Sequence, residues 1–290
     1  MDSKKLGPSQ IELPEIGLGT WKYSGGVAPL RHGIELGATL IDTAESYGTE
    51  ELVGQAIHGI RKEVFLATKI SPHHFRRGDV QRAAEASLRR LGTDYLDLYQ
   101  LHWPNLIVPL EETMSAMEEL VEQGKVRYIG VSNFLVEELQ RAQAALSRHR
   151  IFSNQVRYSL IDRTIEGKLL PYCRQNRIAV IAFTPLGHGL EQIRRMDPAD
   201  TLGQVAGQAG KTPAQAALNW CLAEEGVMVI PKASSVEHVT DDCGASGWRL
   251  SPEQMARLRR GVQFSRRGPV EMALRRTTRY FFQRFGLEPA

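Results

Sequence analysis

Cysteines are few in this 290-residue chain, which has only Cys173, Cys221 and Cys243 and no Cys-x-x-Cys pair. An odd number of widely spaced cysteines argues against a disulfide framework and against a zinc site, so we expect three reduced thiols. The chain has no apolar run of about 18 residues, the length that a membrane helix needs, and its first ten residues are polar. We therefore expect a cytoplasmic protein without a secretory signal or stable membrane association.

Excess charge is also small, at +3 for the whole chain. Residues 261–290 hold six arginines against two glutamates, a net charge of +4, so the rest of the chain stands at −1. Because a nucleic-acid site needs a basic patch on the main domain, we expect no nucleic-acid partner. The basic tail could cover the pocket, form an oligomer contact or lie on an anionic membrane; its weak periodicity favours packing on the main domain. We expect a monomer or a weak homo-oligomer.

The glycine loop Gly-x-Gly-x-x-Gly of open dinucleotide-binding sheets is missing, since Gly17-Leu18-Gly19 has Lys22 where the third glycine would stand. This absence disfavours an open sheet of that kind. The chain instead alternates short β-branched or apolar runs with segments of helical period, the pattern of repeated βα units.

Eight predicted strands joined by helices close most naturally into a barrel. The predicted fold class is therefore α/β, a (β/α)8 TIM barrel formed by a single domain over residues 1–290. The core barrel is expected at about 11–250, with a short N-terminal hairpin before it and an added C-terminal helix and tail over 251–290. The predicted strands are 16–19, 39–42, 64–69, 96–101, 128–131, 152–156, 179–183 and 227–230.

Helical period is clearest in five of the segments between strands. The segment 186–211 is long for an ordinary βα loop, and we expect it to be functional or mobile. The predicted helices are 80–91, 110–123, 136–147, 168–175 and 212–222.

Titratable residues gather at the ends of three successive predicted strands. Asp42, Lys69 and His102 end or follow these strands, and Tyr47 lies in the loop after Asp42. In a barrel these ends share one rim, where active sites are built. A tyrosine, with an ordinary pKa near 10, donates a proton at neutral pH only if its phenolate is stabilised, and Lys69 would supply that charge. We expect Asp42 to hold Lys69, and His102 to orient a carbonyl.

A candidate phosphate site follows the eighth predicted strand. The segment 230–238 runs from the strand into a helix, whose N-terminal amides could meet a phosphate together with Lys232. An alternative interpretation is a capping box, in which Ser234 caps the helix with Glu237. Both can hold if one of Ser234 and Ser235 caps while the other binds the ligand.

Seven motifs in order, together with the strand-end residues, resemble the aldo-keto reductase family over about residues 11–248. The resemblance implies that Asp42, Tyr47, Lys69 and His102 form the catalytic tetrad, as the strand ends also suggest. The motifs are Gly17-Leu18-Gly19-Thr20-Trp21, Ile41-Asp42-Thr43-Ala44 with Tyr47-Gly48, Ala67-Thr68-Lys69, Leu101-His102-Trp103-Pro104, Ile129-Gly130-Val131-Ser132-Asn133-Phe134, Asn154-Gln155-Val156 and Thr184-Pro185-Leu186-Gly187.

The resemblance also implies a nicotinamide cofactor and residues that bind it. Ser132, Asn133 and Gln155 would hydrogen-bond the carboxamide, and Phe183 would stack on the ring where the family commonly has tyrosine. The implied cofactor-binding residues are Thr20, Trp21, Asp42, Ser132, Asn133, Gln155, Phe183, Thr184, Leu186, Lys232, Ser234, Ser235, His238 and Asp242.

Two of these positions bear on the choice of cofactor. His238 and Asp242 stand where many members have an arginine for the 2′-phosphate and an asparagine near the adenine. A neutral histidine and an added carboxylate weaken the case for a phosphorylated cofactor, whereas Lys232 and the serines favour it. We expect NADPH, with NADH possible.

The substrate is expected to be a small carbonyl compound, an aldehyde or ketone with some apolar bulk, because Trp21 and Trp103 flank the tetrad. With Tyr47 and His102 they make up the expected substrate site. A rival interpretation is a cofactor-binding barrel with little turnover that acts as a redox-sensing or regulatory subunit. Another rival uses Lys69 as a Schiff-base amine, although Asp42 would keep that amine charged. The adjacent His73 and His74 cannot easily both reach one ion, and no acidic residue lies next to them in the sequence, so we expect no metal.

Overall fold

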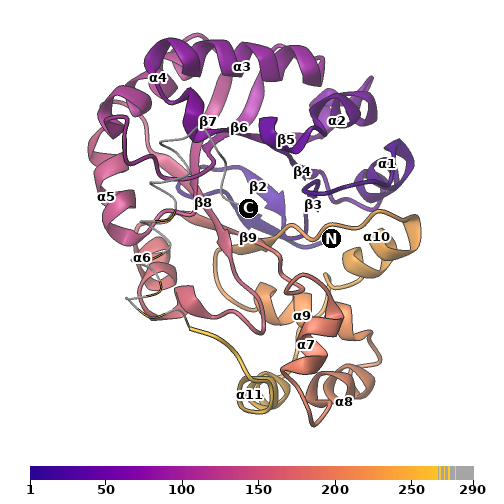
Figure 1. Cartoon of the computed structure of the whole chain (residues 1–290). Helices are drawn as coiled ribbons and strands as arrows, with labels where there is room; N and C mark the ends of the chain where they lie inside the picture. The colour runs from indigo at the N-terminus through magenta and orange to yellow at the C-terminus, as the bar shows by residue number, and fades with distance from the viewer. Residues whose placement is uncertain (267, 269–270, 272–273, 275–277, 279–290) are drawn as a thin grey trace.

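Eight parallel strands form one sheet in the computed structural model, which describes residues 1–266, 268, 271, 274 and 278 (Figure 1). Ile16, just before the first strand of this sheet, forms a parallel bridge with Val229 at the end of the last strand, and the Gly17 amide donates to the Val229 carbonyl at 2.8 Å. These contacts join the two edges and confirm the predicted (β/α)8 barrel. In order around the sheet the strands are β3 (Leu18–Gly19), β4 (Leu40–Asp42), β5 (Phe65–Ile70), β6 (Leu96–Leu101), β7 (Val126–Ser132), β8 (Ile151–Arg157), β9 (Ala179–Phe183) and β10 (Val227–Val229).

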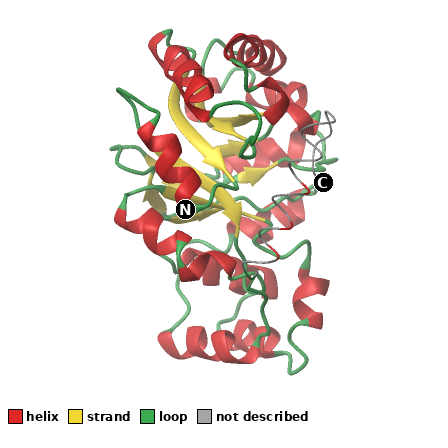
Figure 2. Cartoon of the chain, turned by 60° about the vertical axis from the view of Figure 1, so that its left-hand side comes forward, coloured by secondary structure: helices red, strands yellow, loops and turns green. Residues whose placement is uncertain are grey.

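Helices surround the strands, as a barrel with alternating βα units requires (Figure 2). The helices that begin at Pro213 and Pro252 start as their sequences indicate. In each, the hydroxyl of the residue before the proline, Thr212 or Ser251, accepts from the backbone amide three residues later. The helices are α1 (Val27–Glu35), α2 (Glu50–Ile57), α3 (Arg77–Leu91), α4 (Leu110–Glu122), α5 (Val136–Ala144), α6 (Leu169–Gln175), α7 (Leu190–Arg195), α8 (Thr201–Gln208), α9 (Pro213–Leu222), α10 (Val236–Cys243) and α11 (Pro252–Gly261), with short 3-10 turns η1 (Glu45–Tyr47), η2 (Arg61–Glu63), η3 (Pro72–His74) and η4 (Thr164–Gly167).

The apolar core has two parts. A large cluster lies between the sheet and the helices, and a smaller one combines side chains of β4, β5, β6, β9 and β10 with Leu6 and Leu13. Space inside the barrel is tight: a Cβ at Gly130 would lie 2.5 Å from the Ser153 hydroxyl, so β7 has a glycine there. The filled interior makes the carboxyl ends of the strands the place for a site.

The predicted N-terminal hairpin is confirmed, with β1 (Ser3–Lys5) pairing antiparallel to β2 (Glu12–Pro14). Lys4 fastens it to the barrel, because its Nζ donates to the carbonyls of Leu222, Glu224 and Val227 at 2.5–3.0 Å. Burial lowers the pKa of Lys4 to about 8. The hairpin therefore covers the end of the barrel at which β10 begins.

The segment 186–211 differs from the loop that its length suggests. It contains α7 and α8, which are short but packed through Ile193 and Leu202. The Asp197 carboxylate accepts from the amides of Thr201 and Leu202 at 2.9 and 2.7 Å and so begins α8. The sequence did not predict these two helices within the long loop, because tertiary capping and packing stabilise helices too short to show a clear period. A functional role for the segment stays a prediction.

The chain returns to the barrel after the predicted C-terminal helix, α11. Ser265 forms a parallel bridge with Asp162, in the loop after β8, and buried Arg163 donates to the carbonyls of Leu258 and Arg259. Most of the basic tail predicted beyond this point lies outside the described residues. Within the described part of the chain, no helix is long and apolar enough to cross a membrane.

Candidate active site

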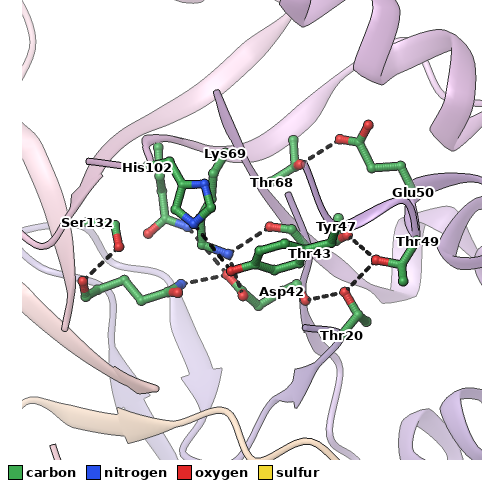
Figure 3. Close-up of polar contacts among 12 residues, drawn as sticks. Thr20, Asp42, Thr43, Tyr47, Thr49, Glu50, Thr68, Lys69, His102 and Ser132 are labelled. Atoms are coloured by element: carbon green, nitrogen blue, oxygen red, sulfur yellow. Dashed lines mark hydrogen bonds and ion pairs between the residues drawn. The ribbon is translucent and has the colours of Figure 1, made fainter. Parts of the chain in front are cut away.

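A buried ion pair stands at the carboxyl ends of β4 and β5 (Figure 3). The Lys69 Nζ donates to Asp42 Oδ2 at 2.6 Å and to the Thr43 carbonyl at 2.8 Å. Lys69 is fully buried and Asp42 is 2% exposed. A charge so far from water needs a partner of opposite sign, and the strand register supplies it. The expected pairing of Lys69 with Asp42 is therefore present.

Tyr47 reaches this pair from η1, the turn after β4. Its hydroxyl lies 3.4 Å from Nε2 of His102, and its ring centroid is 4.7 Å from the Lys69 Nζ. Gly48 follows with φ +68°, a conformation that favours glycine and lets the chain turn toward α2. The four predicted residues thus meet on one rim.

The charges of this group suit proton donation. Burial lowers the pKa of Lys69, but the Asp42 carboxylate and Tyr47 raise it more, so the net pKa is raised and the ammonium persists. Burial, with a further effect of Lys69, lowers the pKa of His102 to about 3. The site therefore combines a phenol hydroxyl, a fixed positive charge and a neutral imidazole.

The three residues implied for the carboxamide form one hydrogen-bonded set. Asn133 Nδ2 donates to the Ser132 hydroxyl at 2.9 Å and to the His102 carbonyl at 3.1 Å. Gln155 Nε2 donates to Asp42 Oδ1 at 2.6 Å, which ties the set to the ion pair. Asn133 has φ +63°, a strained backbone of the kind that gathers at ligand sites.

Aromatic side chains stand around the rim. Trp103 stacks on His102 with ring centroids 6.1 Å apart, as an aromatic wall beside the tetrad requires. Trp21, 39% exposed, meets His188 edge-on at 6.0 Å. His188 also has a positive φ, of 67°. Phe183 ends β9 with the Arg157 guanidinium 5.8 Å from its ring.

Thr20 and the segment after β9 complete the surroundings. The Thr20 hydroxyl donates to the Asp42 carbonyl at 3.0 Å, so this residue touches the tetrad through the backbone. Thr184 has φ +48°, and its buried Oγ1 is among the polar atoms without a hydrogen-bond partner in the described structure. Leu186, partly buried, packs against the large apolar cluster.

The capping of α10 corrects the capping-box interpretation. Ser235, not Ser234, is the N-cap, and its hydroxyl accepts from the His238 amide at 3.3 Å. Ser234 instead accepts from the Ser24 amide at 3.4 Å. The helix begins one residue later than the box requires, so Glu237 is not at its third position. Lys232 and His238 are exposed around this helix start.

Asp242 is buried in α10, 7% exposed. Burial, with a smaller effect of Asp241, raises the pKa of Asp242 to about 7. Near neutral pH a large share of this carboxyl is therefore uncharged, so it opposes a nearby phosphate less than the sequence suggests.

Asp242→Asn is expected to raise the Tm by several degrees at pH 8 and by progressively less toward pH 4. The folded pKa lies above the unfolded one, so stability falls as pH rises through the window from about 4 to 7, and asparagine removes that loss. Thermal unfolding at a series of pH values measures this. Asp241→Asn is the control: it keeps an Oδ1 that accepts from the Thr212 hydroxyl at 2.8 Å and removes only the neighbouring charge, so its gain should be much smaller. An equal gain for Asp242→Asn at every pH would contradict the titration.

Among the described residues, no group of three histidine, cysteine or acidic side chains is placed to hold a metal. His74 pairs with Glu45 at 3.0 Å. The sequence assigned no role to the hydroxyls of Thr43 and Thr49, which lie 2.9 Å apart beside Tyr47 (Figure 3). Threonine is too common in loops for these positions to have stood out.

Comparison with known proteins agrees with this geometry. The model of the aldo/keto reductase family matches residues 15–262. The chain is 41% identical to methylglyoxal reductase YeaE of Escherichia coli (strain K12) over 259 residues, covering 86% of this chain and 90% of that protein. It is 43% identical to an aldo/keto reductase from Klebsiella pneumoniae solved in complex with NADP and acetate, with a TM-score of 0.83 over 91% of this chain and 96% of that one.

A thermostable aldo-keto reductase, Tm1743, solved with the inhibitor epalrestat, is likewise 43% identical, with a TM-score of 0.83 over 89% of this chain and 99% of that one. The chain belongs to the aldo/keto reductase family, as its motifs predict. It is an oxidoreductase of that family.

Proposed function

We propose that the protein is an NADPH-dependent carbonyl reductase, which reduces an aldehyde or ketone to the alcohol and can run in reverse, with Tyr47 as proton donor. The observation that carries the proposal is the placement of the Tyr47 hydroxyl 3.4 Å from neutral His102 and beside the Lys69–Asp42 pair. Solved relatives hold NADP or NADPH. The first relative above is a methylglyoxal reductase, which makes small aldehydes the first substrates to test.

The residues present fit a nicotinamide cofactor. Two buried polar atoms on the rim, Thr184 Oγ1 and His102 Nδ1, have no partner within the described structure, so they are available to a bound molecule. Ser132, Asn133 and Gln155 would hold the carboxamide. Phe183 would face the ring. Trp21 and Leu186 would flank the cofactor, and Lys232, Ser234, Ser235, His238 and Asp242 would surround the adenosine phosphate.

NADPH, when bound, supplies the hydride. His102, neutral and next to Tyr47, would hydrogen-bond the substrate carbonyl oxygen and orient it. Tyr47 would donate its proton to that oxygen as negative charge develops there, because Lys69 stabilises the resulting phenolate. Asp42 keeps Lys69 charged and in place, while Trp21 and Trp103 would hold the apolar part of the substrate. The raised pKa of Lys69 opposes the Schiff-base alternative, which needs an uncharged amine.

We also propose that the protein works in the cytoplasm, as a monomer or a weak homo-oligomer. The buried free thiols of Cys173 and Cys221 support a reducing compartment.

Steady-state kinetics with NADPH and NADH, against methylglyoxal and a panel of aldehydes, ketones and quinones, test the function. We expect turnover of at least one small aldehyde and a higher kcat/KM with NADPH, because Lys232 and the two serines offer hydrogen bonds to a phosphate. No oxidation of either cofactor across the panel, despite cofactor binding, would favour the regulatory barrel. A higher kcat/KM with NADH would overturn the cofactor preference alone.

A further inference from the structure

Three threonine hydroxyls form a continuous chain behind the tetrad (Figure 3). Thr43 Oγ1 lies 2.9 Å from Thr49 Oγ1, and Thr49 Oγ1 lies 3.0 Å from Thr20 Oγ1. Thr20 and Thr43 are fully buried and Thr49 is 6% exposed. Buried hydroxyls linked in this way are held in fixed positions, since each depends on its neighbours for its hydrogen bonds.

The far end of the chain fixes its direction. The Thr20 hydroxyl donates its single proton to the Asp42 carbonyl, which can only accept. Thr49 must therefore donate to Thr20, and Thr43 must donate to Thr49. The chain runs one way, from the residue after Asp42 back to the carbonyl of Asp42 itself, and so surrounds the peptide at the end of β4.

Thr49 does not cap its own helix with its hydroxyl. It is the N-cap residue of α2, where a threonine hydroxyl normally accepts from an amide of its own helix. No such bond exists here. At α9 the corresponding hydroxyl, that of Thr212, does cap its helix and accepts from Gln215 at 3.1 Å. The Thr49 hydroxyl therefore does not cap α2 and hydrogen-bonds Thr43 and Thr20 instead.

Both ends of the hydroxyl chain lie next to the tetrad. The Thr43 carbonyl accepts from the Lys69 Nζ, and the residues between Thr43 and Thr49 form the turn that carries Tyr47. The next residue, Glu50, accepts from the Thr68 hydroxyl at 2.6 Å, beside Lys69 in β5. Two successive residues thus anchor the start of α2 to both strands that end in the ion pair.

We propose that Thr49 is a positioning residue, whose hydroxyl closes the turn over residues 43–49 and holds Tyr47 against Lys69 and His102. This inference rests on the proposed function for its effect on turnover. Removing the hydroxyl leaves Thr43 without its acceptor and Thr20 without its donor. The turn then relaxes, and the Tyr47 hydroxyl moves away from the Lys69 ammonium. Thr49 has no contact with substrate in this scheme.

The test compares Thr49→Val, which keeps the shape but loses the hydroxyl, with Thr49→Ser, which keeps it. We expect Thr49→Val to lower kcat for aldehyde reduction by about 10- to 100-fold, the size of effect that a displacement of about 1 Å can have. KM and the Kd for NADPH should stay within about twofold, and the alkaline limb of the kcat–pH profile should shift to higher pH because Lys69 then stabilises the phenolate less. Thr49→Ser should restore both kcat and the profile.

Thr212→Val is the matched control, because it removes an N-cap hydroxyl remote from the rim. It should lower the Tm and leave kcat unchanged. Thr49→Val with the kcat and pH profile of the parent would overturn the inference, as would Thr49→Ser that is as slow as Thr49→Val.

A second measurement needs no turnover, and so separates this inference from the proposed function. If the hydroxyl chain exists, Thr20→Val and Thr49→Val are coupled, and the double variant loses less Tm than the two single losses combined. Additive losses of Tm would mean that the hydroxyls of Thr20 and Thr49 are not coupled, and would overturn the inference. A parent enzyme inactive with every carbonyl would overturn the proposed function instead, while the Tm comparison would still decide whether the chain is present.

Discussion

Tyr47→Phe is expected to lower kcat for carbonyl reduction by about 10²–10⁴-fold, the contribution typical of a positioned general acid. NADPH should bind with an affinity close to that of the parent. The variant keeps the ring that lies 4.7 Å from the Lys69 Nζ and 5.5 Å from the His102 ring, so the packing of the rim is retained. Only the hydroxyl that faces His102 is lost, so the expected defect lies in proton transfer.

Fluorescence titration with NADPH and steady-state reduction of the best aldehyde separate binding from turnover. Tyr172→Phe, which removes a hydroxyl from α6 in the outer ring of helices, is the matched control and should behave like the parent. Turnover by Tyr47→Phe at the parent rate would show that the proton comes from another group. A large loss of NADPH affinity would show that Tyr47 shapes the cofactor site.

The barrel could be predicted because its strands are short apolar runs bounded by turn residues. Strands β6 and β9 have the predicted bounds, and the other six differ by one or two residues at one or both ends. The closure between Ile16 and Val229 follows from the number of strands, since eight parallel strands with outer helices curl until the edges meet. The same logic placed Asp42, Lys69 and His102 on one rim.

The features that could not be predicted from the sequence depend on tertiary contacts. Helices α7 and α8 begin where Asp197 and the core allow, which no local period of six to eight residues reveals. The cap of α10 was misplaced by one residue, because Ser234 and Ser235 are equivalent in sequence and only packing against Ser24 distinguishes them. The roles assigned to the cofactor residues stay predictions until variants are measured.

The charge state of Asp242 shows how burial changes a sequence argument. As a carboxylate it counts against a phosphorylated cofactor, but burial raises its pKa to about 7 and removes part of that charge at neutral pH. His238 remains exposed at the helix start, where a bound phosphate would be accessible to it. The two departures from the family pattern therefore weigh less against NADPH than they do in the sequence alone.

Lys69→Met is expected to abolish most turnover and also to destabilise the fold, and the two effects can be separated. Without the ammonium, Asp42 is a carboxylate only 2% exposed, left with amide donors such as Gln155 at 2.6 Å. Removing one partner of a buried pair typically costs about 3–5 kcal/mol of unfolding free energy. The loss of charge beside Tyr47 should lower kcat by about 10²–10³-fold.

The double variant Lys69→Met/Asp42→Asn distinguishes the two roles of the ion pair. Asparagine removes the unpaired charge, so part of the lost unfolding free energy should return, while kcat stays low because no cation faces the phenolate. Denaturant unfolding and steady-state kinetics on the parent, the single and the double variants measure both. Turnover that recovers together with stability would mean that Lys69 acts only by holding the barrel rim together. A single variant as stable as the parent would mean that water reaches Asp42 when Lys69 is gone. Stability without activity is the outcome that assigns the charge of Lys69 to catalysis.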